Sequence, residues 1–282
     1  MANFKASARS VDMLGRQQIA GIPNAINEIF KNAYDAYAKE VRVDYLENDK
    51  VLFIRDNGYG MTRDDFENKW LILGTDSKTT EKNIYVPKDN VRRHVLGEKG
   101  IGRLSIATIG PSVLVVTRAN RDDKISKITT SFISWTLFEI PGISIDEIPV
   151  PVVESDSMPD ESVVSNLRKE IIDFYNKVRS SGKYNISTEL DSKIKSSLDF
   201  QPYSPKQLSH QYCDTDIKEY SSTLYLDDNF NGTHFYISPV DPILSALLLK
   251  NSLYKGDLND LIKQLLGFYP TFLPDAKQEM LT

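Results

Sequence analysis

Residues 24–37 constrain this chain more than any other segment, because their spacing predicts a helix with two chemically different faces. Glu28, Asn32 and Asp35 recur at i, i+4 and i+7 and therefore share one face. Apolar residues occupy the opposite side: Ile26, Ile29, Phe30, Ala33 and Tyr37. Taken alone, such a helix is best interpreted as amphipathic, with a buried apolar face and a polar face in water. The alternative is a site, because these oxygen groups suit a hard cation and an activated water.

A second segment, residues 51–61, predicts a buried strand that ends in a tight turn. The strand is rich in β-branched and aromatic residues, and Asp56, Gly58 and Gly60 follow it. The glycines allow a positive φ or a close approach of the backbone to a ligand. An aspartate at the end of a buried strand can accept a hydrogen bond from an amino group in a pocket. A plain hairpin is the alternative, since Asn-Gly is a strong hairpin signal, but residues 62–73 favour a helix over a partner strand.

A third segment, residues 97–110, has three glycines before a run of small and apolar residues at helical spacing. They are Gly97, Gly100 and Gly102. A glycine-rich loop that opens a helix presents N–H groups to an anion, typically a phosphate. The spacing G-x-x-G-x-G matches neither the P-loop nor the dinucleotide-binding fingerprint. By itself the segment is also compatible with an ordinary loop.

In this order the three segments resemble the motifs of the GHKL ATPase superfamily, which includes DNA gyrase B, the heat-shock chaperone ATPase, the histidine kinases and MutL. A fourth match is the Gly232-Thr233 pair, which precedes an alternating strand. The resemblance covers roughly residues 10–120 and 223–238. It implies an α+β fold of the Bergerat type, a two-layer α/β sandwich in which helices cover a mixed sheet.

The resemblance also implies a role for each matched residue in a Mg²⁺-dependent ATPase. Glu28 would be the general base that activates water, Asn32 would bind Mg²⁺, and Asp56 would accept a hydrogen bond from the adenine amino group. The other residues expected to contact the nucleotide are Asp35, Gly58, Gly60, Met61, Ser77, Lys78, Gly97, Lys99, Gly100, Ile101, Gly102, Arg103 and Thr233. For Lys78, a solvated loop lysine is an equally weighted alternative. Phosphoryl transfer to water needs mainly positioning and charge neutralisation, which such a set supplies.

Within the superfamily, residues 71–78 and 97–103 look most like MORC-type ATPases and their bacterial relatives. The first histidine is His94, which argues against a histidine kinase with an upstream phosphoacceptor. The resemblance implies slow hydrolysis of ATP to ADP, closure of a lid over about 74–103, and nucleotide-gated homodimerisation as part of a larger machine. Bacterial antiviral defence is one expected setting. Two alternatives stay open: an ATP-binding sensor or scaffold without useful turnover, and a nucleic-acid-binding clamp.

Composition bounds the partners and the compartment. The net charge of -5 gives no overall attraction to nucleic acid. A local basic cluster does lie between the second and third motifs: Lys78, Lys82, Lys88, Arg92 and Arg93. The one cysteine, Cys213, fits a reducing compartment, so we expect a cytoplasmic protein. No run of residues is long enough to span a membrane, and the N-terminus lacks the apolar core of a signal peptide.

The chain divides into a domain of residues 1–242 and a tail of residues 243–282. Residues 154–222 are expected to be a mostly helical insertion in the domain. The tail is apolar and helical in pattern over 243–273, so it must bury itself on the core, on another subunit or on a further domain.

Overall fold

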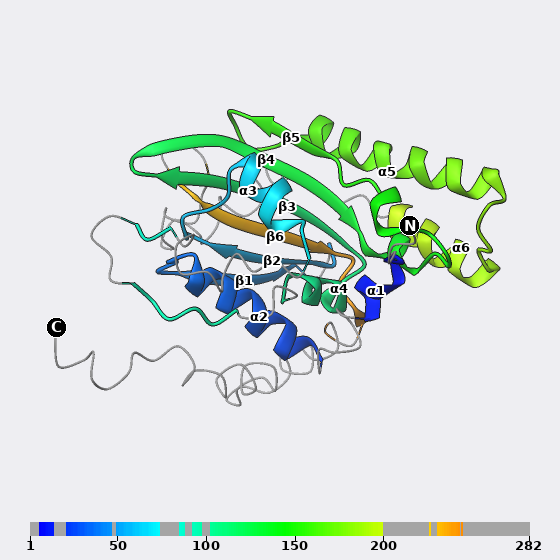
Figure 1. Ribbon diagram of the computed structural model, residues 1–282, viewed down its shortest axis with the longest axis horizontal. Coiled ribbons are helices and arrows are strands. Elements are labelled where there is room, and N and C mark those ends of the chain that lie inside the picture. The colour runs from blue at the N-terminus through cyan, green and yellow to red at the C-terminus, as the bar shows by residue number, and fades with distance from the viewer. Residues whose placement is uncertain are drawn as a thin grey trace, which may run out of the picture.

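The computed structural model describes residues 6–13, 21–46, 49–73, 85–87, 92–97, 102–199, 226, 230–242 and 244. Its centre is a sheet of six strands in the order β1-β2-β6-β3-β4-β5, with helices along it (Figure 1). The strands are β1 (Val41–Leu46), β2 (Val51–Asp56), β3 (Ser112–Arg121), β4 (Lys124–Ser134), β5 (Val152–Ser155) and β6 (Gly232–Ser238). The α+β class is therefore confirmed.

Every described strand pairing is antiparallel, where a mixed sheet was expected. The reason is the position of β6, which comes from late in the chain. It lies between β2 and β3 and is antiparallel to both. The strands β2 and β3 run in the same direction, but β6 separates them, so no parallel ladder forms between them.

The helices include two long segments and several short ones. The two long helices are α2 (Ile22–Asp35) and α5 (Glu161–Ser181). The remaining elements are α1 (Arg9–Asp12), α3 (Arg63–Asp65), the π-helical turn η2 (Phe66–Trp70), η5 (Gly102–Ser105), α4 (Ile106–Ile109), η6 (Trp135–Glu139), η7 (Ile145–Glu147) and α6 (Thr188–Asp199). Among the described residues, no helix has the length and apolarity needed to cross a bilayer.

One face of the sheet is covered by α4 and α2. Because side chains alternate along a strand, Thr233, Phe235 and Ile237 of β6 point to the same face. Gly110, at the end of α4, lies against the Ile237 side chain on that face. The Ser105 hydroxyl just before α4 donates to the carbonyl of Ala25 in α2, at 3.2 Å. This helical layer therefore covers the face on which Thr233 lies.

The helices α5 and α6 give the expected helical character to residues 160–200. The Asp160 side chain caps α5 by accepting the N–H of Val163. The Tyr175 hydroxyl donates to Asp191 at 2.5 Å and joins the two helices. The proposed limits of the insertion, 154–222, and of the domain, 1–242, stay predictions. The expected tail helix falls almost wholly outside the described residues.

Candidate functional site

The helix α2 carries the first sequence motif, and this helix and the residue after it contact the other two motifs, which lie far apart in the chain. The carboxylate of Asp35, its last residue, accepts the N–H groups of Leu96 (2.8 Å) and Gly97 (3.1 Å) at the start of the glycine-rich segment. Just beyond the helix, the carbonyl of Ala36 accepts the N–H of Tyr59 in the second motif, at 2.8 Å. The helix that carries the expected polar stripe therefore lies next to both the second and the third motif.

Glu28 lies where the third motif enters its helical turn. A Cβ built on Gly102 would lie 2.8 Å from Oε2 of Glu28, so these two residues are direct neighbours. Lys31, one turn along α2, forms an ion pair with Oε1 of Glu28 at 2.7 Å. Both side chains are partly exposed, and Asn32 is half-buried on the same side of the helix. A carboxylate and an amide oxygen are therefore held one helical turn apart beside the glycine-rich segment.

Asp56 ends β2 as a buried acid. Its residue is 5% exposed, and Oδ1 accepts the N–H of Gly58 at 2.8 Å. Burial raises the pKa of Asp56 to about 7, and the hydrogen bonds from the backbone N–H groups of Gly58 and Thr233 oppose that rise. A buried carboxyl whose pKa is raised this strongly marks a candidate ligand-binding position.

Two glycines allow the backbone to close tightly around Asp56. Gly60 has a φ of 63°, and a Cβ there would lie 1.9 Å from the carbonyl oxygen of Arg118. A Cβ on Gly232 would lie 2.0 Å from the carbonyl oxygen of Asp56 itself. Any side chain at either position would push β2, β3 and β6 apart, which accounts for glycine at both.

A buried threonine network lies beside Asp56. The Thr117 hydroxyl accepts the N–H of Met61 at 2.9 Å and lies 2.9 Å from the carbonyl of Gly232 and 3.0 Å from the hydroxyl of Thr233. It therefore ties β3 to both the second and the fourth motif. Asn231 adds a bond from its amide group to the Gly58 carbonyl, at 2.7 Å.

Sequence reasoning missed Thr117 and Asn231. The signal for Thr117 was present, because it continues the alternation of Val113 and Val115 on one face of β3 with a polar residue. No comparable signal marked Asn231. Its contact depends on β6 crossing beside β2, a long-range arrangement.

This geometry agrees with a known family. The sequence profile described as histidine kinase-, DNA gyrase B-, and HSP90-like ATPase matches residues 21–157, which contain α2, Asp56 and the glycine-rich segment. Over residues 21–157, the chain therefore belongs to this GHKL ATPase superfamily.

Several curated proteins are similar to part of this chain. The chaperone protein HtpG of Wigglesworthia glossinidia brevipalpis is 22% identical over 170 residues, which is 59% of this chain and 27% of HtpG. ATPase morc-1 of Caenorhabditis elegans is 30% identical over 161 residues, 54% of this chain and 17% of that protein. A candidate type II restriction enzyme of Herpetosiphon aurantiacus, HgiDII, is 37% identical over 79 residues, 28% of this chain and 12% of that protein. The GHKL chain thus spans 27% or less of each of these three relatives.

The other expected site residues of this GHKL chain fall in two groups. Ser77, Lys78, Lys99, Gly100 and Ile101 lie outside the described residues. Arg103 is described, and its guanidinium donates to the carbonyls of Lys69 (2.8 Å) and Trp70. Burial lowers the pKa of Arg103 to about 10. In this structure Arg103 therefore joins the third motif to the end of η2.

Proposed function

We propose that this GHKL domain binds ATP with Mg²⁺ and hydrolyses the ATP slowly. The observation that carries the proposal is the convergence on α2. Glu28 lies against Gly102, Asp35 holds Leu96 and Gly97, and the turn after Asp56 is bonded to the end of the same helix. The helix α2 thereby brings together Glu28, the glycine-rich segment that would bind phosphate, and the turn that follows the buried Asp56.

The adenine base is assigned to the Asp56 end of the site. Its amino group would donate to the Asp56 carboxylate, in a setting that already excludes water from that acid. The network through Thr117 and Thr233 fixes the three strands around the carboxylate. Met61, which is partly buried against the core and bonded through its N–H to Thr117, would pack against the base.

The phosphate end is assigned to Glu28, Asn32 and the glycine-rich segment. The donor set fits Mg²⁺, which usually takes one or two protein oxygens, several waters and the phosphates. Asn32 would hold the ion, and bound Mg²⁺ would neutralise charge on the phosphates. Glu28 would accept the proton of the attacking water, and its ion pair with Lys31 keeps the carboxylate oriented toward Gly102.

The test separates hydrolysis from binding. In Glu28→Gln, ATP affinity is expected to stay within about twofold of the wild type while turnover falls by about 100-fold or more. Glu170→Gln, at an exposed position on α5, is the control and should change neither. Turnover that survives in Glu28→Gln would remove Glu28 as the base, whereas a wild type that binds ATP without turnover would favour the sensor or scaffold.

ATP-gated homodimerisation is the finer part of the proposal. It is supported by the family and requires a difference in ATP affinity between open and closed states. Light scattering after size exclusion, with and without a non-hydrolysable ATP analogue, measures it directly. A chain that stays monomeric when saturated with analogue would overturn dimerisation and leave the ATP site unaffected. The setting in antiviral defence stays a prediction.

The nucleic-acid clamp is less well supported. Arg93 of the expected basic cluster donates to the carbonyls of Tyr34 (3.0 Å) and Ala38 (3.3 Å) and stacks on two tyrosine rings of the same region. It is therefore occupied in packing at the end of α2. Steeply salt-dependent binding to DNA would favour the clamp in spite of this contact.

A further inference from the structure

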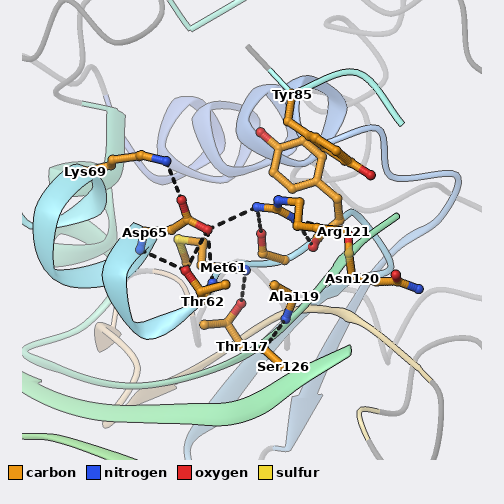
Figure 2. Close-up of polar contacts among 12 residues, drawn as sticks. Met61, Thr62, Asp65, Lys69, Tyr85, Thr117, Ala119, Asn120, Arg121 and Ser126 are labelled. Carbon is orange, nitrogen blue, oxygen red and sulfur yellow. Dashed lines mark hydrogen bonds and ion pairs between the residues drawn. The ribbon is translucent and has the colours of Figure 1, made fainter. Parts of the chain in front are cut away.

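Arg121, at the end of β3, is held between two tyrosine rings that come from different segments. Its guanidinium carbon lies 4.2 Å from the ring centre of Tyr59 and 4.8 Å from that of Tyr85. The two rings meet edge to face, with centres 5.4 Å apart. Figure 2 shows Arg121 beneath Tyr85 and directed toward Asp65. Stacking of this kind stabilises a planar cation, the more so when it is partly buried.

The same guanidinium binds the turn that follows Asp56. Nη1 donates to the carbonyl of Tyr59 at 2.6 Å, and Nη2 donates to the carbonyl of Gly60 at 2.9 Å. Nη2 also lies 3.2 Å from Oδ2 of Asp65. The forked donor group therefore fixes two successive carbonyls beside the proposed adenine site, together with the first turn of α3.

Asp65 connects this cluster to the capping box of α3. Its carboxylate accepts the N–H and the hydroxyl of Thr62, and it forms an ion pair with Lys69 at 2.5 Å (Figure 2). Thr62 directly follows Met61, whose N–H is bonded to Thr117. Arg121 thus binds both the carbonyls of the turn and the acid of the capping box that follows the turn.

Tyr85 brings in a segment that is separate from the turn. Its hydroxyl accepts the N–H of Asp122 at 3.1 Å and lies 3.4 Å from the Asp122 carboxylate. Tyr85 is therefore attached to the β3–β4 turn by its hydroxyl and to Tyr59 and Arg121 by its ring. Arg121 therefore contacts Tyr85, Tyr59 and Asp65 at the same time.

We infer that Arg121 is a positioning residue of the nucleotide site, which couples the docked position of residues 85–87 to the turn 58–61. The inference rests on the proposed function for its nucleotide part. A ligand that binds the ordered turn would favour the docked position of Tyr85 by some factor. Loss of the docked position would lower the affinity for that ligand by the same factor. Arginine suits this task better than lysine, because only its forked guanidinium can bind two carbonyls and Asp65 while its central carbon lies over both rings.

The first part of the test uses the protein without nucleotide. Hydrogen exchange is measured on peptides covering residues 57–62 in Arg121→Lys, in Tyr85→Ala, in the double variant and in Lys124→Gln, an exposed control on the same hairpin. Each single variant is expected to speed exchange in 57–62 by about five- to tenfold, and the double variant by no more than the larger single effect, since contacting residues are non-additive. Wild-type exchange in Tyr85→Ala, or single effects that multiply in the double variant, would overturn the coupling.

The second part measures a non-hydrolysable ATP analogue by calorimetry and ATP turnover by steady-state kinetics. Arg121→Lys and Tyr85→Ala are expected to weaken analogue binding by about tenfold while kcat at saturating ATP stays within about twofold. Unchanged affinity in both variants, or a loss confined to kcat, would overturn a positioning role. If the wild type binds no analogue, the proposed function fails, and the exchange experiment still decides the coupling.

Discussion

At the scale of single residues, the site depends on how closely the backbone surrounds Asp56. The acid is buried, and carbonyl oxygens approach Gly60 and Gly232 so closely that no Cβ would fit there. The Thr117 hydroxyl is bonded to the N–H of Met61 and to the carbonyl of Gly232. Burial sets the protonation of Asp56, and steric contact sets the identity of Gly60. Each of these statements predicts a measurable change in stability.

Asp56 should give the folded protein a characteristic pH dependence. Its pKa is raised from 3.8 to about 7, so the folded state holds a proton that the unfolded state releases in this interval. The stability that protonated Asp56 contributes is complete below about pH 4 and is lost as the pH rises to about 7, by at most on the order of 4 kcal/mol. Relative to Asp56→Asn, the free energy of unfolding in urea should therefore fall over this range. A difference between the two proteins that is independent of pH would contradict the raised pKa.

Gly60 and Gly182 offer a matched comparison, because both have φ near 60° but differ in their surroundings. A Cβ on Gly60 would meet the carbonyl of Arg118 at 1.9 Å, whereas nothing lies within 4 Å of one on Gly182. Gly182→Ala should cost about 1 kcal/mol from the backbone conformation alone. Gly60→Ala should cost at least about 3 kcal/mol or prevent folding, as seen by thermal unfolding. An equal loss of stability in the two variants would mean that the turn around Gly60 moves to accommodate a Cβ.

At the scale of elements, α2 is the support on which the motifs are assembled. Most of its apolar residues are buried, Asp35 accepts N–H groups of the glycine-rich segment, and Glu28 lies against Gly102. The end of the helix is further bonded by Arg93 through the carbonyls of Tyr34 and Ala38. The segment 92–97 is thus attached to the end of α2 near both of its own ends, through Arg93 and through the N–H groups that Asp35 accepts.

Asp35→Asn tests this attachment. The carboxylate accepts two N–H groups, whereas an amide has one oxygen and a donor that would face an N–H. Hydrogen exchange in peptides covering 92–97 should increase by about tenfold, since each net hydrogen bond contributes about 1 kcal/mol. Asp173→Asn, exposed on α5, should leave it unchanged. Exchange at the wild-type rate in Asp35→Asn would show that other contacts hold the segment.

Local elements were predictable from the sequence, and their long-range partners were not. The buried strand β2 followed from the β-branched and aromatic residues that begin at Val51, and α2 followed from the stripe of Glu28, Asn32 and Asp35. The position of β6 between β2 and β3 leaves no local signal, and the contacts of Thr117 and Asn231 depend on it. The helix expected over 62–73 becomes a short α3 and a π-helical turn, whose last carbonyls accept Arg103.

At the scale of the whole molecule, the chain combines the proposed nucleotide site on one face of the sheet with the further helices α5 and α6. The family assignment covers residues 21–157, while β6 supplies Thr233 from much later in the chain. A nucleotide that binds between these parts should therefore stabilise the folded chain as a unit. Such stabilisation increases with the ratio of ligand concentration to Kd.

The proposed dependence on Mg²⁺ rests on Asn32. A non-hydrolysable ATP analogue with Mg²⁺ at 100 times its Kd should raise the free energy of unfolding by about 2.7 kcal/mol, and chelation with EDTA should remove most of that gain. Asn32→Ala should show a small gain that EDTA no longer changes, whereas Asn176→Ala on α5 should behave like the wild type. A full, EDTA-sensitive gain in Asn32→Ala would assign Mg²⁺ to other groups.

The most direct test of the central claim is calorimetric titration of a non-hydrolysable ATP analogue into the wild type and into Asp56→Asn, with a GTP analogue as the comparison ligand. We predict saturable binding of one ATP analogue per chain in the wild type, at least about 100-fold weaker binding in a folded Asp56→Asn, and no saturation with the GTP analogue. Equal affinity of the wild type and Asp56→Asn for the ATP analogue, or no binding by the folded wild type, would contradict the account.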